Sequence, residues 1–293
     1  MRATARGWTA AWLVLLVLVQ VAAFIVAWRV ALHTGLGQWI DTVALTGNRI
    51  GQDRIDEPVD RILNAMSVVS LLAATVVIGF IALMRGRIAL AITATLLIAG
   101  ANVTTQLLKH GLSRPDLGID LERIYAGNSL PSGHTAVAAS VAVALVLVLP
   151  AKVRALGAFV GAGYAAAAGV ATLSAGWHRP SDALTAFLVV GVWAALAGLV
   201  LLVTQREQAQ ISTADAHRVA TVVLGVGGVI ALVLSGLALG WLTDLRAVAP
   251  DALSRRALFV AYAGSAAGIA GTMAVVMALV LAVVHRLVPR HQG

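Results

Sequence analysis

Apolar stretches long enough to cross a lipid bilayer recur along this chain of 293 residues. A membrane-spanning helix needs about 20 apolar residues to cross a hydrocarbon core of roughly 30 Å. Hydrophobic residues make up 60% of the chain and charged residues only 12%, and a soluble domain cannot bury that much apolar surface. We therefore predict an all-α fold, a polytopic transmembrane helical bundle. The expected spans are residues 8–32, 63–84, 88–108, 133–150, 155–175, 182–203, 219–242 and 258–284.

The ends of the chain and its loops give an expected orientation. Arg2 and Arg6 precede the first span, but that apolar stretch is too long for a signal peptide, so we interpret it as a retained helix. An even number of spans places both termini on the same side. Lys and Arg divide almost evenly between the two sides, so the assignment rests on basic pairs in the very short loops at 85–87 and 152–154. We expect a multi-pass protein of the plasma membrane with both termini in the cytoplasm.

Two polar segments interrupt the spans. In the first, residues 33–62, the stretch 39–45 is expected to form a short amphipathic helix on the membrane surface. Acidic residues that follow could bind a cation, although a solvated loop face is the favoured interpretation; they are Asp53, Asp56, Glu57 and Asp60. The second segment, 204–217, indicates a linker. It separates a six-helix core, residues 1–205, from residues 206–293, which add a transmembrane hairpin.

His178 and Asp182 form the first candidate catalytic pair. At spacing i, i+4 the two side chains share one helix face, so the carboxylate can accept from one ring nitrogen and leave the other as a nucleophile. The alternative is a surface ion pair at a helix start, with Pro180 at the first helical position. Taken alone, the motif favours the ion pair.

The second motif, Pro131-Ser132-Gly133-His134, opens the fourth span. Ser132 and Gly133 are expected to offer free backbone N–H groups at a helix N-terminus, which favours phosphate binding. His134 would project from the first turn, where it could protonate a departing oxygen. The alternative, which the motif by itself favours, is an ordinary serine N-cap beside an interfacial histidine.

The third group consists of cations. Lys109 ends the third span and Arg114 follows it, although single cations at helix ends are often interfacial anchors. Polar residues near that end indicate that it faces protein or water; they are Asn102, Thr104, Thr105 and Gln106. Counting spans places this end, the start of the fourth span and the turn between the fifth and sixth on one membrane face. The three motifs therefore indicate a single site.

In these motifs the chain resembles the type 2 phosphatidic acid phosphatase superfamily, over roughly residues 60–205. That family carries Lys-x6-Arg-Pro, then Pro-Ser-Gly-His, then Ser-Arg-x5-His-x3-Asp. The second motif is complete here, and His178 and Asp182 match the end of the third. The last two helices lie outside the six-helix core usual for the family.

The chain departs from the family pattern at both of its arginines. With six residues between them, as in the family motif, the arginine position that follows Lys109 is Asp116, and the nearest arginine lies two residues earlier. In the third motif, the serine and arginine fall on Ala171 and Thr172. The residues expected to replace the missing charge are Arg114, Arg179 and Arg123.

The resemblance implies a phosphatase that acts on an amphiphilic lipid phosphate, either a phosphatidyl-type phosphate or a polyprenyl pyrophosphate. In such an enzyme His178 forms a phosphohistidine, Asp182 orients it, and His134 acts as acid and base. Lys109, Ser132 and the arginines bind the phosphate, without a metal or other cofactor and without nucleic acid. The chain has no cysteine, which excludes disulfides and thiol catalysis. Two alternatives stay open: a phosphotransferase that uses the same phosphohistidine, and a non-catalytic membrane scaffold or transporter.

Overall fold

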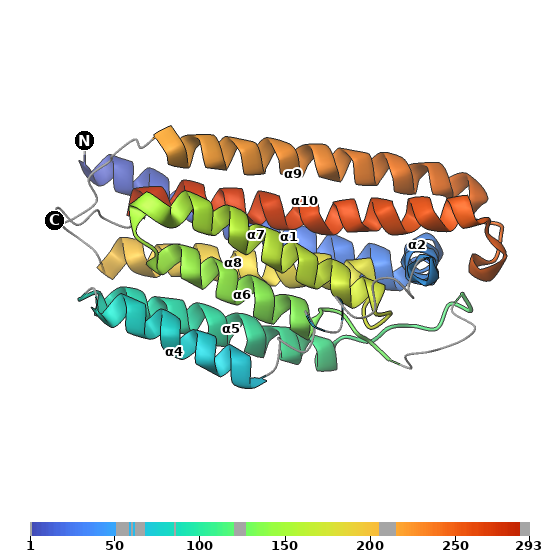
Figure 1. The fold of residues 1–293 in the computed structure, drawn as a ribbon, viewed down its shortest axis with the longest axis horizontal. Helices are drawn as coiled ribbons and strands as arrows, with labels where there is room; N and C mark the ends of the chain where they lie inside the picture. Colours follow the sequence, from blue (N-terminus) through green and yellow to red (C-terminus); the bar gives the residue numbers. More distant parts are fainter. Residues whose placement is uncertain are drawn as a thin grey trace.

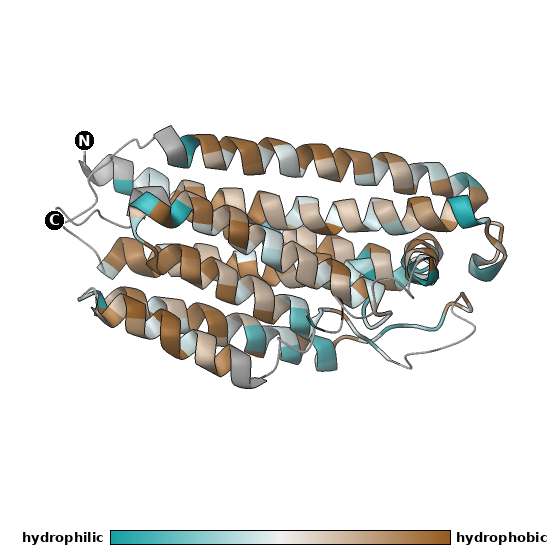
Figure 2. Cartoon of the chain, in the orientation of Figure 1, coloured by the Kyte–Doolittle hydropathy of each residue, from teal (hydrophilic) through white to brown (hydrophobic). Residues whose placement is uncertain are grey.

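Long helices run roughly parallel to one another along the molecule, with polar residues gathered at their ends (Figures 1 and 2). The computed structural model describes residues 2–50, 59, 61, 68–84, 86–119, 127–204 and 215–287. Within these ranges the regular secondary structure is helical throughout, which confirms the all-α prediction. The longer helices are α1 (Arg2–His33), α2 (Gly35–Thr46), α4 (Val68–Met84), α5 (Ile88–Gly111), α6 (Gly133–Val148), α7 (Ala151–Ser174), α8 (Pro180–Thr204), α9 (Asp215–Leu242) and α10 (Arg255–Leu287). Three short 3-10 helices are η1 (Gly47–Arg49), η2 (Thr243–Leu245) and η3 (Pro250–Ala252).

Six of the described helices, α1, α5, α7, α8, α9 and α10, are long and apolar enough to cross a membrane. The expected spans at 63–84 and 133–150 appear as shorter apolar helices, and α6 has 16 residues. At 1.5 Å per residue that is about 24 Å, less than the roughly 30 Å of a hydrocarbon core. Neighbouring helices cover most of α6, so it crosses the bundle inside protein. The protein is a polytopic helical bundle.

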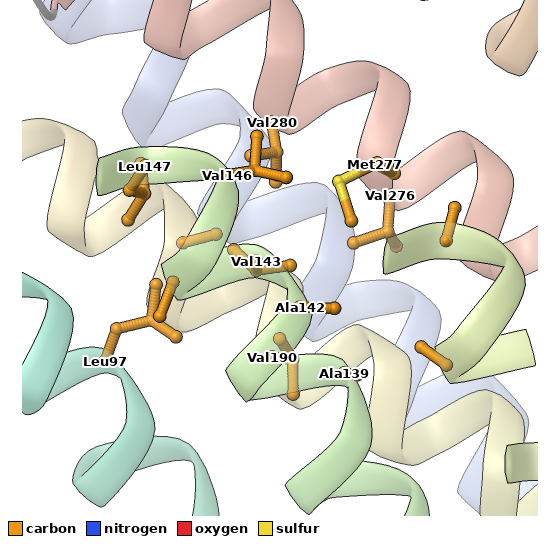
Figure 3. Packing of buried hydrophobic residues seen from close by; sticks show 14 of the residues in the cluster. Leu97, Ala139, Ala142, Val143, Val146, Leu147, Val190, Val276, Met277 and Val280 are labelled. Atoms are coloured by element: carbon orange, nitrogen blue, oxygen red, sulfur yellow. The ribbon is translucent and has the colours of Figure 1, made fainter. Parts of the chain in front are cut away.

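The core forms where α5, α6, α7, α8 and α10 meet (Figure 3). Val143 and Val146 of α6 pack there with Val190 of α8 and Met277 of α10. Small residues let the helices approach closely: a Cβ added at Gly100 would lie 2.5 Å from the ring of Trp193. The last helix is therefore part of this core, while the division into a six-helix core and an added hairpin stays a prediction.

Helix α2 lies across the end of the bundle, seen along its axis in Figure 1. The helix expected around residues 39–45 is confirmed, and its apolar side faces protein, while its placement on the membrane surface stays a prediction. Its apolar side, which includes Trp39 and Val43, packs against Leu242 and Ala257 of α9 and α10, and Trp39 Nε1 donates to the carbonyl of Val248 at 3.0 Å. Apolar side chains on α10 occupy the place that lipid was expected to take.

The beginning of α1 and the end of α10 lie at the end of the bundle opposite α2 (Figure 1). At the α2 end, α7 stops, α6 and α8 begin, and α5 leads into its loop, as the span count predicted. The acidic residues of the 53–60 loop, and most of the expected linker at 204–217, lie outside the described residues.

Candidate active site

The turn between α7 and α8 presents His178. Gly176 adopts the left-handed conformation at φ 72°, which glycine enters without steric cost. The N–H groups of Trp177 and His178 then both donate to the carbonyl of Thr172, at 3.0 and 3.1 Å. Pro180 starts α8 one residue after Arg179, where a proline loses no helical hydrogen bond. The turn and the helix start thus fix His178 just outside α8.

Asp182 binds three donors through a single carboxylate oxygen. Its Oδ2 accepts from His178 Nδ1 at 3.0 Å, from Ser129 Oγ at 2.7 Å and from the backbone N–H of Arg179 at 3.0 Å. Asp182 is fully buried and His178 is only 6% exposed, so the pair is part of the protein interior. Because Nδ1 donates to the carboxylate, Nε2 carries the lone pair of the neutral ring. Burial of both residues excludes an ion pair at the surface, and in the tautomer that donates from Nδ1 the Nε2 atom has a free lone pair.

His134, in the first turn of α6, lies beside this pair. Its ring centroid is 6.3 Å from that of His178 and 5.3 Å from that of Trp177. Lys109, near the end of α5, lies within electrostatic range of His134. The two histidines and the lysine therefore come together from α5, α6 and the turn before α8, as the motifs predicted.

The N-terminus of α6 differs from the sequence-based expectation at Ser132. The N–H of Ser132, expected to be free, donates to the carbonyl of Asp182 at 2.9 Å, and its hydroxyl caps the helix by accepting from Thr135 N–H at 3.3 Å. This ties α6 to the start of α8. Among the described residues, the N–H groups of Gly133 and His134 have no acceptor, so these two are available to an anion.

The cations are arranged around the same end of the bundle. Asn128 joins the end of α5 to the loop before α6, because its Nδ2 donates to the carbonyls of Lys109 at 3.2 Å and Leu130 at 2.7 Å. Arg179 is 2% exposed and its Nη1 lies 3.5 Å from Ser129 Oγ. Arg114 is partly buried in the loop after α5. Arg123 lies outside the described residues.

The structure adds two residues that the sequence motifs did not identify, Ser129 and Asp41. Asp41 of α2 is 4% exposed and accepts from Ser181 Oγ at 2.5 Å and from Ser181 N–H at 3.3 Å. Burial and, to a smaller extent, the charge of Asp182 raise the pKa of Asp41 from 3.8 to about 6, against the opposing effects of the Ser181 hydrogen bond, Arg114 and Arg179. No local signal marks Asp41, because its place depends on how α2 folds back on the bundle.

The positions at which the family carries its serine and second arginine hold small side chains in the interior. Ala171 packs with Val59 and Ala175, and the fully buried Thr172 donates its hydroxyl to the carbonyl of Gly169 at 2.8 Å. These positions contribute no charge. Within the described ranges, no group of three or more His, Cys, Asp or Glu side chains is placed to hold a metal ion.

Fold and site together define a polytopic membrane protein whose polar centre suits phosphate chemistry. Residues 89–209, which contain all three motifs, match the family model of the PAP2 superfamily. That part of the chain is similar to the superfamily that the motifs indicated, whose members are phosphatases that act on phosphate esters. No match was found among curated proteins or solved structures.

Proposed function

We propose that this protein hydrolyses a lipid phosphate or polyprenyl pyrophosphate through a phosphohistidine on His178. The observation that carries the proposal is the buried His178–Asp182 pair, with His134 beside it, at the end of an apolar helical bundle. A carboxylate that holds one ring nitrogen leaves the other oriented as a nucleophile.

In the first step the Nε2 lone pair of His178 attacks phosphorus, and the bond from phosphorus to the leaving oxygen breaks. Protonated His134 donates its proton to that oxygen, so the lipid alcohol or phosphate leaves without an additional negative charge. In the second step His134 takes a proton from water, the water oxygen attacks phosphorus, and the N–P bond breaks. Acid–base assistance of this kind contributes about 10²–10⁴-fold.

Positive charge and backbone N–H groups stabilise the transferring phosphoryl group. Lys109, Arg114 and Arg179 supply charge, with Arg123 as a further candidate, and Gly133 supplies an N–H group at the helix N-terminus. Ser132 contributes by capping that helix. Neutralisation by these groups is the main requirement of phosphoryl transfer, so the proposed reaction needs no metal or other cofactor.

The position of the site supports an amphiphilic substrate. The polar centre lies at the end of helices that are long enough to cross a bilayer, which is where lipid phosphates lie. The apolar tail of the substrate would then extend along the helices. We further propose a plasma-membrane location with cytoplasmic termini, which puts the site on the outer face.

Phosphate release from a panel of lipid phosphates and polyprenyl pyrophosphates tests this function. The wild-type protein should turn over at least one of them and trap acid-labile phosphate, and His178→Ala should lose both. His110→Ala is the matched control, since His110 is an exposed histidine whose Nδ1 lies 2.7 Å from the carbonyl of Gln106 in its own helix. Undiminished turnover in His178→Ala would overturn the mechanism.

A further inference from the structure

A short segment outside the family match contacts three of the elements around the site. Helix α2 and η1, residues 35–49, precede the matched residues 89–209. Three of their polar side chains are buried, Gln38 at 3%, Asp41 at 4% and Asn48 at 8% exposed. Burying polar groups costs free energy unless they find partners, and each of the three finds one on a different element around the site.

Two of these contacts hold the flanks of the site. Gln38 Nε2 donates at 2.8 Å to the carbonyl of Pro115, the residue after Arg114. Asn48 Nδ2 donates at 3.2 Å to the carbonyl of Ser174, the last residue of α7. The second contact lies against Gly176, where an added Cβ would come within 2.9 Å of Asn48 Nδ2. The loop after α5 and the turn before His178 are thus both attached to this segment.

The central contact comes from Asp41. Its carboxylate accepts two hydrogen bonds from Ser181, which lies between Arg179 and Asp182 in the chain. The same carboxylate lies within electrostatic range of Arg114, Arg179 and Asp182. An asparagine or serine would also accept a hydrogen bond from Ser181, so the buried negative charge calls for a further reason. The two arginines supply it, because a negative charge in the interior attracts guanidinium groups that lie within electrostatic range.

Helix α2 is held rigidly enough for this task. On its other side, Trp39 and Ala44 pack with Leu253 and Ala261, and the N-cap Thr34 accepts from Gly37 N–H at 3.0 Å. Apolar packing of this kind resists small displacements. A group carried on α2 therefore keeps its position relative to α8.

We infer that Asp41 is a positioning residue for the phosphatase site. Its carboxylate holds the turn from His178 to Asp182 through Ser181, and its charge attracts the guanidinium groups of Arg114 and Arg179. The second part of this inference rests on the proposed function, since it assigns the arginines to the phosphate. Asp41 itself needs no contact with the substrate.

The test compares Asp41→Ala and Asp41→Asn with Thr46→Ala, all in the full chain. Thr46 is the matched control, because its hydroxyl donates only within α2, to the carbonyl of Thr42 at 2.9 Å. Amide hydrogen exchange over residues 176–183 reports on the turn without requiring activity. Loss of both hydrogen bonds in Asp41→Ala should raise this exchange about ten- to a hundredfold, whereas Thr46→Ala should leave it unchanged.

Kinetics separate the charge from the hydrogen bond. Asparagine keeps an acceptor for Ser181, so Asp41→Asn should restore exchange close to that of the wild type. Its kcat should stay about tenfold or more below the wild type, because a neutral amide does not hold the guanidinium groups and small misplacements are costly. Full recovery of kcat in Asp41→Asn would overturn the role toward the arginines. If amide exchange in Asp41→Ala equals that in Thr46→Ala, the positioning role is overturned. The exchange measurement does not require activity, so it gives this answer even for a wild type that releases no phosphate. Absence of phosphate release would refute the proposed function instead.

Discussion

Asp182→Asn is the substitution that most directly tests how the nucleophile is prepared. In the wild type, Asp182 Oδ2 accepts from His178, Ser129 and Arg179 N–H. Asparagine keeps the size of the side chain but has one oxygen and one NH₂ group, and it carries no charge. The change therefore alters the hydrogen bonds and leaves the packing almost intact.

The size of the effect follows from those contacts. Hydrogen bonds to a charged group are worth about 1.5–3 kcal/mol and neutral ones about 0.5–1.5 kcal/mol, so three weakened bonds cost roughly 3 kcal/mol. The NH₂ group would replace Oδ1, which is buried and has no hydrogen-bond partner among the described residues, so an unpaired polar group lies there in both forms. We expect Asp182→Asn to lower the free energy of unfolding by roughly 3 kcal/mol.

Turnover should fall further than stability explains. In the serine protease triad, the same change in the aspartate lowers kcat about 10⁴-fold by favouring the wrong histidine tautomer. The assay is kcat at saturating substrate, measured below the unfolding temperature of the variant. Ser129→Ala is the control, because it removes one of the three donors and should lower kcat less than tenfold. If Asp182→Asn keeps kcat within about threefold of the wild type, Asp182 does not orient the nucleophile.

Further outcomes follow from the buried charges and the orientation. Because the pKa of Asp41 is raised from 3.8 to about 6, the folded state loses stability as the pH rises from about 4 to about 6, by about 3 kcal/mol in all. The unfolding temperature of the wild type should therefore fall relative to that of Asp41→Asn between pH 4 and pH 7, and a difference that stays constant would contradict this. Replacing Arg114 or Arg179 by alanine should raise KM and lower kcat together. Lysine at either position should rescue activity only in part, because an ammonium lacks the two-pronged geometry of a guanidinium group. Near wild-type kinetics in both alanine variants would exclude the two arginines from the phosphate site. In the cysteine-free chain, an impermeant thiol reagent should modify Leu117→Cys but not Gln208→Cys in intact cells, and the reverse pattern would invert the orientation.

Local sequence patterns predicted the parts of the site that depend on local geometry. His178 and Asp182 meet because four residues separate them at a helix start, and Ser132 caps α6 because its side chain reaches the N–H of a residue three positions later. Their convergence on one end of the bundle followed from the number of spans. These features need only helix geometry and an even count of crossings.

The features that escaped prediction depend on contacts between distant segments. The N–H of Ser132 is taken by the carbonyl of Asp182, a residue that no local rule pairs with it. The amphipathic pattern around Trp39 predicts which side of the helix is apolar. It does not distinguish lipid from protein as the partner of that side, since both are apolar. For this reason the sequence did not predict that Asp41, on the polar side of the same helix, lies at the site.

The packing of α2 gives the last two helices a structural connection to the site. Leu242 and Ala257, from α9 and α10, bury the apolar side of α2, and the opposite side of α2 holds Ser181 through Asp41. The matched residues 89–209 contain the proposed nucleophile and acid and the capped helix, but they contain neither Asp41 nor its support. The interaction of a buried carboxylate with two arginines depends on the separation of the charges, since electrostatic interactions are strong where water is excluded. In the role that we infer for Asp41, α2 and the helices α9 and α10 keep that separation constant, so the chain beyond the motifs would take part in forming the site.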